Sequence, residues 1–193
     1  MAETNQFFVH ASSYIDDEVI IGKGTKVWHF CHVMSSSKIG KNCVLGQNVM
    51  IANNVILGNS VKVQNNVSIY EGVRCEDDVF IGPSAVFTNV INPRSSVDRK
   101  AEFKETIVKT GATIGANATI ICGNSIGKYA FIGAGAVVNR DIKDFELVVG
   151  NPVRHVGWMS EFGERLEFDE KGIAKCNKDG NSYSLVNDKV KKN

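Results

Sequence analysis

An aliphatic residue recurs at every sixth position over most of this 193-residue chain. The series comprises Val9, Ile15, Ile21, Val27, Val33, Ile39, Leu45, Ile51, Leu57, Val63, Ile69, Cys75, Ile81 and Phe87, and resumes at Val108, Ile114, Ile120, Ile126, Ile132 and Val138. All members except Cys75 and Phe87 are Ile, Leu or Val. A period of six fits neither a helical turn of about 3.6 residues nor simple strand alternation, so an internal repeat governs the fold.

Two further columns of the repeat indicate its shape. Four residues after each aliphatic comes a small or β-branched residue, with Asn124 the one clear misfit, so we expect both columns to face inward. The residue before the small one is Gly, Asn or Asp in most repeats, for example Gly24, Asn48 and Asn66, and these types tolerate positive φ. A short strand and a sharp corner every six residues close a triangular prism after three hexads. Successive coils then stack as parallel strands about 4.8 Å apart.

This pattern is typical of the left-handed parallel β-helix, an exception to the right-handed rule for parallel connections. The sequence therefore predicts an all-β protein, with a left-handed parallel β-helix of hexapeptide repeats over residues 1–150 and a loop inserted at a corner at about 93–107. Residues 151–193 form a separate tail in this prediction. In the tail we expect a short amphipathic helix within residues 155–166, weakened by two glycines, and a small β-meander from three runs at 166–168, 173–176 and 183–186. We expect residues 187–193 to be frayed.

Composition excludes several function classes. The formal net charge is +1, and no run of Lys and Arg occurs before the last seven residues, which argues against a nucleic-acid partner. No apolar run approaches the length of a membrane span, and the N-terminus lacks the pattern of a signal peptide, so we expect a cytoplasmic protein without a membrane partner. The five cysteines show no C-x-x-C spacing and read as small core residues or free thiols, with no metal site.

Two polar strips run along the predicted prism at the eighteen-residue spacing of one coil. The first stacks His29 on Gln47 and Asn65, beside the bulky residues Trp28 and Phe30. Large side chains at a corner must project outward, where either a subunit partner or a nucleotide base can stack on them. The second strip contains Asp17, Ser35, Asn53, Glu71 and Asn89 and leads directly into the break in the repeats.

The break reads PRSSVDRKAEFKETI and spans residues 93–107. A solenoid tolerates insertions at its corners, where they leave as loops that often carry function. Arg94, Arg99 and Lys100 are candidates to hold the phosphates or carboxylate of an anionic substrate. The alternative is a solvated loop that wraps a neighbouring subunit.

The end of the repeats contains a run of small residues, Gly133 to Ala136, followed by Gly150-Asn151-Pro152-Val153-Arg154. The second segment resembles the Gly-x-Pro-[AV]-[KR] segment that closes the β-helix of hexapeptide acetyltransferases. That resemblance implies that the pantetheine arm of acetyl-CoA lies along small-residue coils, near basic residues. The residues expected to bind acetyl-CoA are Gly111, Gly133, Ala134, Ala136, Asn151, Pro152 and Arg154.

Residues 64–73, 76–95, 114–127 and 148–159 resemble bacterial acetyltransferases of 3-amino sugar nucleotides. The resemblance implies a cytoplasmic homotrimer with active sites between subunits, which transfers acetyl from acetyl-CoA to a sugar amine. Two substrate classes share these motifs: UDP-2-acetamido-3-amino-2,3-dideoxy-glucuronate, a precursor of O-antigen in lipopolysaccharide, and dTDP-3-amino-3,6-dideoxyhexoses of surface glycans. The tail after Trp158 is more similar to that of the UDP-uronate group, which we favour at this stage.

The resemblance also implies roles for individual residues. Glu71 orients the reacting amine and Asn89 holds the amine or the carbonyl oxygen, while His29, Gln64 and Asn65 bind the substrate together with the loop cations. Many hexapeptide acetyltransferases use His as the general base, but no histidine lies between Ile69 and Arg94. The departing thiolate can then accept the proton itself.

Two other classes of function stay open at this point. One is a non-catalytic module that binds sugar nucleotides on the same scaffold. The other is a serine or xenobiotic O-acetyltransferase, for which a histidine is needed at the acceptor hydroxyl.

Overall fold

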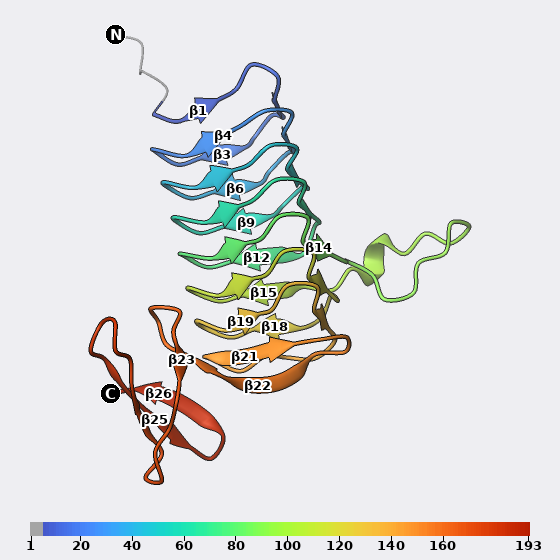
Figure 1. Ribbon diagram of the computed structural model, residues 1–193. Coiled ribbons are helices and arrows are strands. Elements are labelled where there is room, and N and C mark those ends of the chain that lie inside the picture. Colours follow the sequence, from blue (N-terminus) through green and yellow to red (C-terminus); the bar gives the residue numbers. More distant parts are fainter. Residues whose placement is uncertain (1–5) are drawn as a thin grey trace.

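The computed structural model describes residues 6–193 and shows a left-handed parallel β-helix with a loop on one side and a small antiparallel tail at its C-terminal end (Figure 1). Three parallel sheets form the faces of the prism. Strands pair across one coil, so Val9 lies opposite Val27 and Tyr14 opposite His32. The predicted eighteen-residue coil is confirmed.

The strands of each face recur every third element. The first face contains β1 (Phe8–Val9), β4 (Lys26–Val27), β7 (Val44–Leu45), β10 (Lys62–Val63), β13 (Phe80–Ile81), β16 (Thr113–Ile114), β19 (Phe131–Ile132) and β21 (Glu146–Val149). The second contains β2 (Tyr14–Ile15), β5 (His32–Val33), β8 (Met50–Ile51), β11 (Ser68–Ile69), β14 (Val86–Phe87), β17 (Thr119–Ile120) and β20 (Val137–Val138). The third contains β3 (Ile20–Ile21), β6 (Lys38–Ile39), β9 (Ile56–Leu57), β12 (Val73–Cys75), β15 (Thr106–Val108) and β18 (Ser125–Ile126).

The corners between faces adopt the backbone that the sequence predicts. Asn42, Asn48 and Asn54 have φ between 56° and 61°, and glycine occupies the same position in other coils. Gly adopts this left-handed conformation at low cost because it has no Cβ, and Asn does so because its short polar side chain can hydrogen-bond locally. The six-residue repeat is therefore a repeat of corners as well as of apolar residues.

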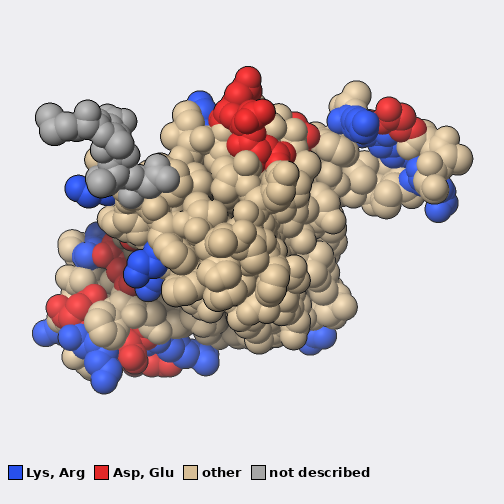
Figure 2. All heavy atoms as spheres, turned by 90° about the horizontal axis from the view of Figure 1, so that it is seen from above, with Lys and Arg blue, Asp and Glu red and all other residues tan. Residues whose placement is uncertain are grey.

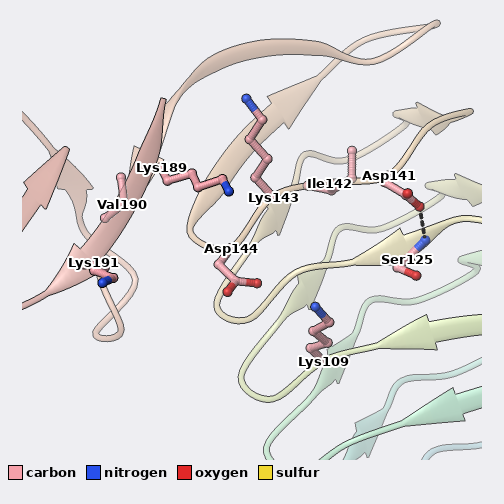
Figure 3. A pocket seen from close by; sticks show the side chains of 9 residues that line it. All are labelled: Lys109, Ser125, Asp141, Ile142, Lys143, Asp144, Lys189, Val190 and Lys191. Atoms are coloured by element: carbon pink, nitrogen blue, oxygen red, sulfur yellow. Dashed lines mark hydrogen bonds between the residues drawn. The ribbon is translucent and has the colours of Figure 1, made fainter. Parts of the chain in front are cut away.

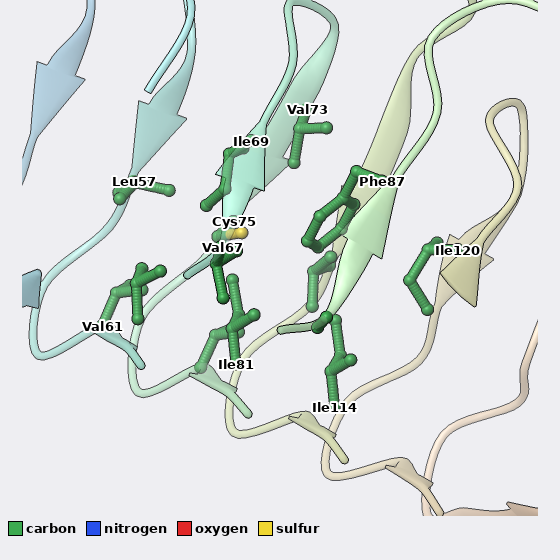
Figure 4. Close-up of a cluster of buried hydrophobic side chains, with 14 of the residues drawn as sticks. Leu57, Val61, Val67, Ile69, Val73, Cys75, Ile81, Phe87, Ile114 and Ile120 are labelled. Atoms are coloured by element: carbon green, nitrogen blue, oxygen red, sulfur yellow. The ribbon is translucent and has the colours of Figure 1, made fainter. Parts of the chain in front are cut away.

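The prism is filled by the two inward columns (Figure 4). Ile69, Ile81, Ile114 and Ile120 are completely buried, and Phe87 fills the position that aliphatic residues hold elsewhere in the column. The five cysteines are buried and free, four of them inside the repeats. Burial raises the pKa of the Cys75 thiol to about 12, as expected for an inert core residue.

The tail differs from the sequence-based prediction in two places. Residues 155–166 contain no helix: β22 (Arg154–Met159) runs antiparallel to β21, and β23 (Arg165–Leu166) pairs with β22. The predicted helix is wrong because the last coil would otherwise end in an unpaired sheet edge, whose N–H and C=O groups β22 satisfies. The only helical element in residues 6–193 is the 3₁₀ helix η1 (Lys100–Glu102) in the loop.

The predicted meander is present: the runs at 173–176 and 183–186 form two of its strands, but its third strand lies within residues 187–193 and not at 166–168. It consists of β24 (Ile173–Lys175), β25 (Ser182–Val186) and β26 (Lys189–Lys192). The expectation of a frayed C-terminus is wrong, because Asn187 and Asp188 both have positive φ and form a two-residue hairpin turn. Tyr183 lies at the centre of a second apolar cluster in the tail, with Phe145, Trp158, Leu166 and Val190.

A buried carboxylate connects the last coil to the tail. Glu146 accepts hydrogen bonds from the Arg140 guanidinium at 2.8 Å and from the backbone N–H of Lys143 at 2.8 Å, and His155 lies 3.3 Å away. Burial by itself raises the pKa of Glu146, but these partners outweigh it and hold the pKa below its ordinary value of 4.5.

We expect truncation of the central column to be costly. Ile81→Ala removes a fully buried side chain and should lower the free energy of unfolding by about 2–5 kcal/mol, because the rigid stack of coils closes over the cavity only in part. Ile20→Ala is the matched control, because Ile20 is 58% exposed on its strand, and should change it by less than about 0.5 kcal/mol. Denaturant unfolding of both variants measures the contrast, and equal costs would contradict the inward placement of the column.

Glu146→Gln should destabilise the protein by about 1–3 kcal/mol near neutral pH, because a buried charge-assisted network loses its anion. Since the folded-state pKa is lowered, the contribution of Glu146 is fully present above pH 4.5 and is lost as the pH falls through the lowered value. Wild type and variant should therefore converge in acid. Thermal melting from pH 7 to pH 3 tests this, with the exposed Glu170→Gln as control. A difference that is independent of pH would refute the charged role.

Candidate functional site

The insertion leaves the β-helix after β14 and returns into β15, at the corner between the second and third faces (Figure 1). Its base is fixed by backbone hydrogen bonds: the Lys104 N–H donates to Asn89 O and the Thr106 N–H donates to Gly72 O, both at 2.9 Å. The projecting part carries both basic and acidic side chains (Figure 2). The predicted loop insertion is confirmed.

A pocket of about 780 Å³ lies against the returning limb of this loop. Its lining comes from three successive coils and from the loop: Met34, Asn53, Asn54, Glu71, Gly72, Arg74, Lys100, Phe103 and Glu105. Arg74 pairs with Glu105 at 2.5 Å and so ties the loop to the third face. We call this hollow the loop pocket.

Glu71 is half-buried in the loop pocket, with its carboxylate held from the neighbouring coil. Asn54 Nδ2 donates to Glu71 Oε1 at 2.9 Å. Asn54 is at a corner position with φ of 61°, and this hydrogen bond shows that its amide reaches the next coil. Sequence reasoning missed Asn54, although its place seventeen residues before Glu71 puts it beside that residue in a coil of eighteen.

Asn89 lies on the same edge, one coil beyond Glu71, because Ser68 pairs with Val86. It is half-buried at the point where the loop departs, but it is not part of the lining of the loop pocket. The structure therefore brings the two predicted catalytic residues to adjacent levels of one edge. We call this edge, with Asn53, Glu71 and Asn89, the loop edge.

The three predicted loop cations have different environments. Lys100 lines the loop pocket. Arg99 is engaged within the loop, where its Nη1 contacts Glu102 at 2.8 Å, and its Nε is buried without a hydrogen-bond partner. Arg94 is exposed near the tip. Of these three cations, only Lys100 lines the same pocket as Glu71 within one chain.

His29, Gln64 and Asn65 lie at a different corner, between the first and second faces. Asn65 Oδ1 accepts a hydrogen bond from the backbone N–H of Gln47 at 2.8 Å, so its amide also braces the coil below. This corner continues through Pro83 and Ala116 to Ala134 by the strand register. We call it the small-residue edge, and the second face separates it from the loop edge.

The predicted cofactor residues divide between two places. Ala134 is exposed on the small-residue edge, and Gly135 beside it has open space around its Cα. Asn151 and Pro152 form the exposed turn between β21 and β22, and Arg154 is exposed at the start of β22. The backbone N–H of Val137 donates to Gly150 O at 3.0 Å, which attaches this turn to the last coil.

Of the other cofactor residues, two are buried and the third lies at a different corner. Ala136 is completely buried, because its position belongs to an inward column of the repeat. Gly133 is buried, and a Cβ there would lie 2.7 Å from Val149. Gly111 is at the third corner, where a Cβ would lie 2.3 Å from the Tyr129 ring. Their contact with a cofactor stays a prediction, and within one chain they are less accessible than Ala134.

A second hollow of about 540 Å³ lies at the third corner, between the β-helix and the tail (Figure 3). Lys109, Lys143, Lys189 and Lys191 line it with Asp141 and Asp144. Asp141 accepts from the Ser125 backbone N–H at 2.7 Å, and Asp144 accepts from that of Lys128 at 2.8 Å. This hollow is remote from Glu71, since it lies on the far side of the third face.

Residues 6–193 contain no group of three or more His, Cys, Asp or Glu side chains arranged to hold a metal ion. In the same part of the chain, no helix is long and apolar enough to cross a membrane.

Comparison with known proteins gives matches of two kinds. The family model described as bacterial transferase hexapeptide (six repeats) matches residues 18–53, and the model of the hexapeptide repeat of succinyl-transferase matches residues 38–71 and 106–140. Among characterised proteins, the dTDP-3-amino-3,6-dideoxy-α-D-galactopyranose 3-N-acetyltransferase of Aneurinibacillus thermoaerophilus is 44% identical over 172 residues, which cover 89% of this chain and 88% of that protein.

Solved structures agree in fold. A hexapeptide-repeat-containing acetyltransferase of Vibrio cholerae, complexed with acetyl coenzyme A, has a TM-score of 0.56 at 25% identity, over 63% of this chain and 70% of that chain. A variant of perosamine N-acetyltransferase from Caulobacter crescentus, complexed with CoA and GDP-perosamine, has a TM-score of 0.50 at 22% identity, over 77% of this chain and 55% of that chain. The second match concerns the fold alone.

Proposed function

Since the chain belongs to the hexapeptide-repeat sugar-nucleotide N-acetyltransferases, we propose that it acetylates the 3-amino group of a dTDP-linked 3-amino-3,6-dideoxyhexose, with acetyl-CoA as donor. The observation that carries this proposal is the 44% identity to an enzyme named for that substrate class, over nearly the whole of both chains. The sequence alone favoured the UDP-linked uronate. That preference rested on the tail and is not supported, because the nearly full-length relative is named for a dTDP sugar.

The site residues of the loop edge suit attack of an amine on an acyl group. Acetyl-CoA supplies the acetyl group as a thioester. Glu71, oriented by Asn54 at 2.9 Å, can accept a hydrogen bond from the neutral sugar amine and point its lone pair at the carbonyl carbon. Asn89 cannot take a proton at neutral pH, so it serves by hydrogen bonding to the amine or to the developing oxyanion. The proton that the amine loses passes to Glu71 or to the departing thiolate.

The acetyl donor is best accommodated on the small-residue edge. Pro83, Ala116 and Ala134 leave this edge without long side chains, and the open space at Gly135 lets a thin chain approach the backbone. The Gly150–Pro152 turn borders the same edge at its C-terminal end. The two halves of the proposed site therefore lie on different edges of one prism.

A second copy of the chain resolves this separation. In a closed homotrimer, the loop edge of one subunit can face the small-residue edge of the next, and three equivalent clefts result. Arg94, exposed near the tip of the loop, then reaches the neighbouring subunit and can meet the phosphates of a nucleotide. We propose this arrangement because it brings the predicted substrate residues of both edges to one ligand.

The substrate proposal is tested by assaying CoA release with acetyl-CoA and a panel of dTDP- and UDP-linked 3-amino sugars. We expect a dTDP-3-amino-3,6-dideoxyhexose to give the highest kcat/KM, with product mass increased by one acetyl group. Preference for the UDP-uronate would restore the alternative. Binding of the sugar nucleotides without release of CoA would instead indicate a non-catalytic module.

Substitutions at Glu71 and Asn89 separate the two roles. Asn89→Ala should lower kcat by about a hundredfold, because one hydrogen bond to the reacting centre is lost. Glu71→Gln should retain more activity than Glu71→Ala if Glu71 only orients the amine. Equal loss in both Glu71 variants, with disappearance of the acidic limb of the pH–rate profile, would identify Glu71 as the base. Near-normal turnover of Asn89→Ala would place the reaction elsewhere.

Ala134 and Ala136 form a matched pair for the donor site. Ala134→Trp adds bulk to an exposed edge, so it should raise the KM for acetyl-CoA at least tenfold while leaving the melting temperature unchanged. Ala136→Trp forces bulk into a filled core and should destabilise the protein by more than about 1 kcal/mol. An unchanged KM in a normally folded Ala134→Trp variant would exclude this edge.

Subunit complementation tests the composite cleft. Glu71→Ala damages the loop edge and Ala134→Trp the small-residue edge, so coexpressed chains should form mixed trimers with some intact clefts. Random mixing restores about a quarter of wild-type activity, since one cleft in four combines two intact edges. Lack of any recovery in mixed trimers, or a monomer in light scattering of the wild type, would contradict the arrangement.

A further inference from the structure

Five aromatic rings gather at the N-terminal end of the small-residue edge: Phe8, His10, Trp28, His29 and Phe30, here called the aromatic platform. The ring centroids of His10 and His29 are 3.6 Å apart, and those of Phe8 and Trp28 are 5.6 Å apart. His29 also lies 6.1 Å from Phe30 and nearly parallel to Trp28, at 6.3 Å and 7°. Trp28 and Phe30 are 40% and 61% exposed, so the rings offer open faces.

Phe30 occupies a corner position that disfavours it. Its φ is 56°, in the left-handed region, where the same corner of other coils has Asn48, Asn66 and Gly135. A bulky residue there is unfavourable by about 1–2 kcal/mol relative to its ordinary conformations. Strain of this kind persists where something else fixes the residue, most often at binding sites.

Tyr129 shows what normally offsets this cost. It has φ of 54° at another corner, and its ring stacks on Phe145 at 5.5 Å, against the apolar cluster of the tail. Phe30 has no comparable cover among residues 6–193, because most of its surface is exposed. The backbone at this corner is held by the hydrogen bond from the Phe30 N–H to Ser12 Oγ at 3.0 Å, which leaves the exposed ring available to a ligand.

Beyond the platform, the residues of the small-residue edge change from aromatic to polar and then to small. Gln47 and Asn65 continue it in steps of one coil, so Asn65 lies about 10 Å from His29 along the axis. Asn65 belongs to the same coil as Glu71, and the small residues begin one coil later at Pro83. A ligand that extends from the platform along this polar stretch ends at the level of the proposed reacting centre.

We propose that the aromatic platform binds the thymine base of the sugar nucleotide, a subsite that rests on the function proposed above. The platform contains no Asp, Glu, Lys or Arg, which suits an uncharged base, and its imidazole and indole nitrogens can hydrogen-bond base edges. Stacking of a base on such rings contributes to binding without charge. The sugar then lies toward Glu71 of the neighbouring subunit, and the thioester arm approaches along the small-residue edge from the opposite end.

The test uses dTDP alone as the probe, in titrations of the intact protein followed by calorimetry and by tryptophan fluorescence. Phe30→Asn installs the residue that other coils use at this corner, so the protein should fold at least as stably. Its affinity for dTDP should fall roughly tenfold or more, as expected for the loss of one stacking partner. Trp28→Phe should keep most of the affinity but lose the quenching of fluorescence, because the second tryptophan, Trp158, is buried in the tail.

Tyr14→Ser is the matched control, because Tyr14 is an exposed aromatic residue of β2 that lies outside the platform. Its affinity for dTDP should equal that of wild type. An unchanged affinity in Phe30→Asn overturns the proposal, and so does dissociation of the trimer in that variant, which would make the platform a contact between copies. If the wild type binds dTDP at the platform but acetylates no amino sugar nucleotide, the base site stands and the proposed function fails.

Discussion

The structure depends on one steric constraint, the left-handed corner that closes each hexad. Without a residue that accepts positive φ at every sixth position, the short strands would not turn, and the inward columns would not meet in a single core. Once the corners exist, strand pairing fixes the coil at eighteen residues. Equivalent positions of successive coils then stack on one another, so similar residues become neighbours. The buried columns of Ile, Val and Ala and the exposed ladders of Asn follow from the same geometry.

This stacking also organises the chemistry. Residues eighteen apart become neighbours, so Asn54, Glu71 and Asn89 meet on one edge although they are distant in sequence. The inserted loop leaves from the same edge and leaves the register of the coils undisturbed, as the pairing of Phe80 with Thr113 shows. A rigid prism with a loop at one corner offers a fixed row of polar groups beside a segment that can reach a second subunit. Small residues are concentrated on another edge, which is why the proposed cleft needs two copies.

The C-terminal end solves a different problem. A stack of parallel coils must stop, and its last strand exposes unpaired backbone groups. Here the chain reverses at the Asn151–Pro152 turn, and β22 covers β21 in antiparallel pairing. Glu146, buried between Arg140 and His155, attaches the last coil to this cover, and Tyr129 extends from the β-helix into the tail cluster. The tail therefore terminates the repeat, and side chains of the last coils pack against it.

The amino-acid sequence by itself determined the coil, because the period of aliphatic residues and the period of corner residues agree. It also determined where the loop leaves and that Glu71 and Asn89 are neighbours, since both follow from counting eighteen residues.

Only the tertiary structure decided the conformation of the segments that lie outside the six-residue period. Residues 155–166 contribute to β22 and β23 because the edge of the sheet needs a partner strand. Local secondary-structure propensity contains no information on that need. Ala136 is buried because its position belongs to an inward column, although the run of small residues from Gly133 to Ala136 looks like a continuous surface. The separation of the two functional edges follows from the same count, but the loop pocket beside Glu71 does not, because it depends on the contacts that the returning loop makes with three coils.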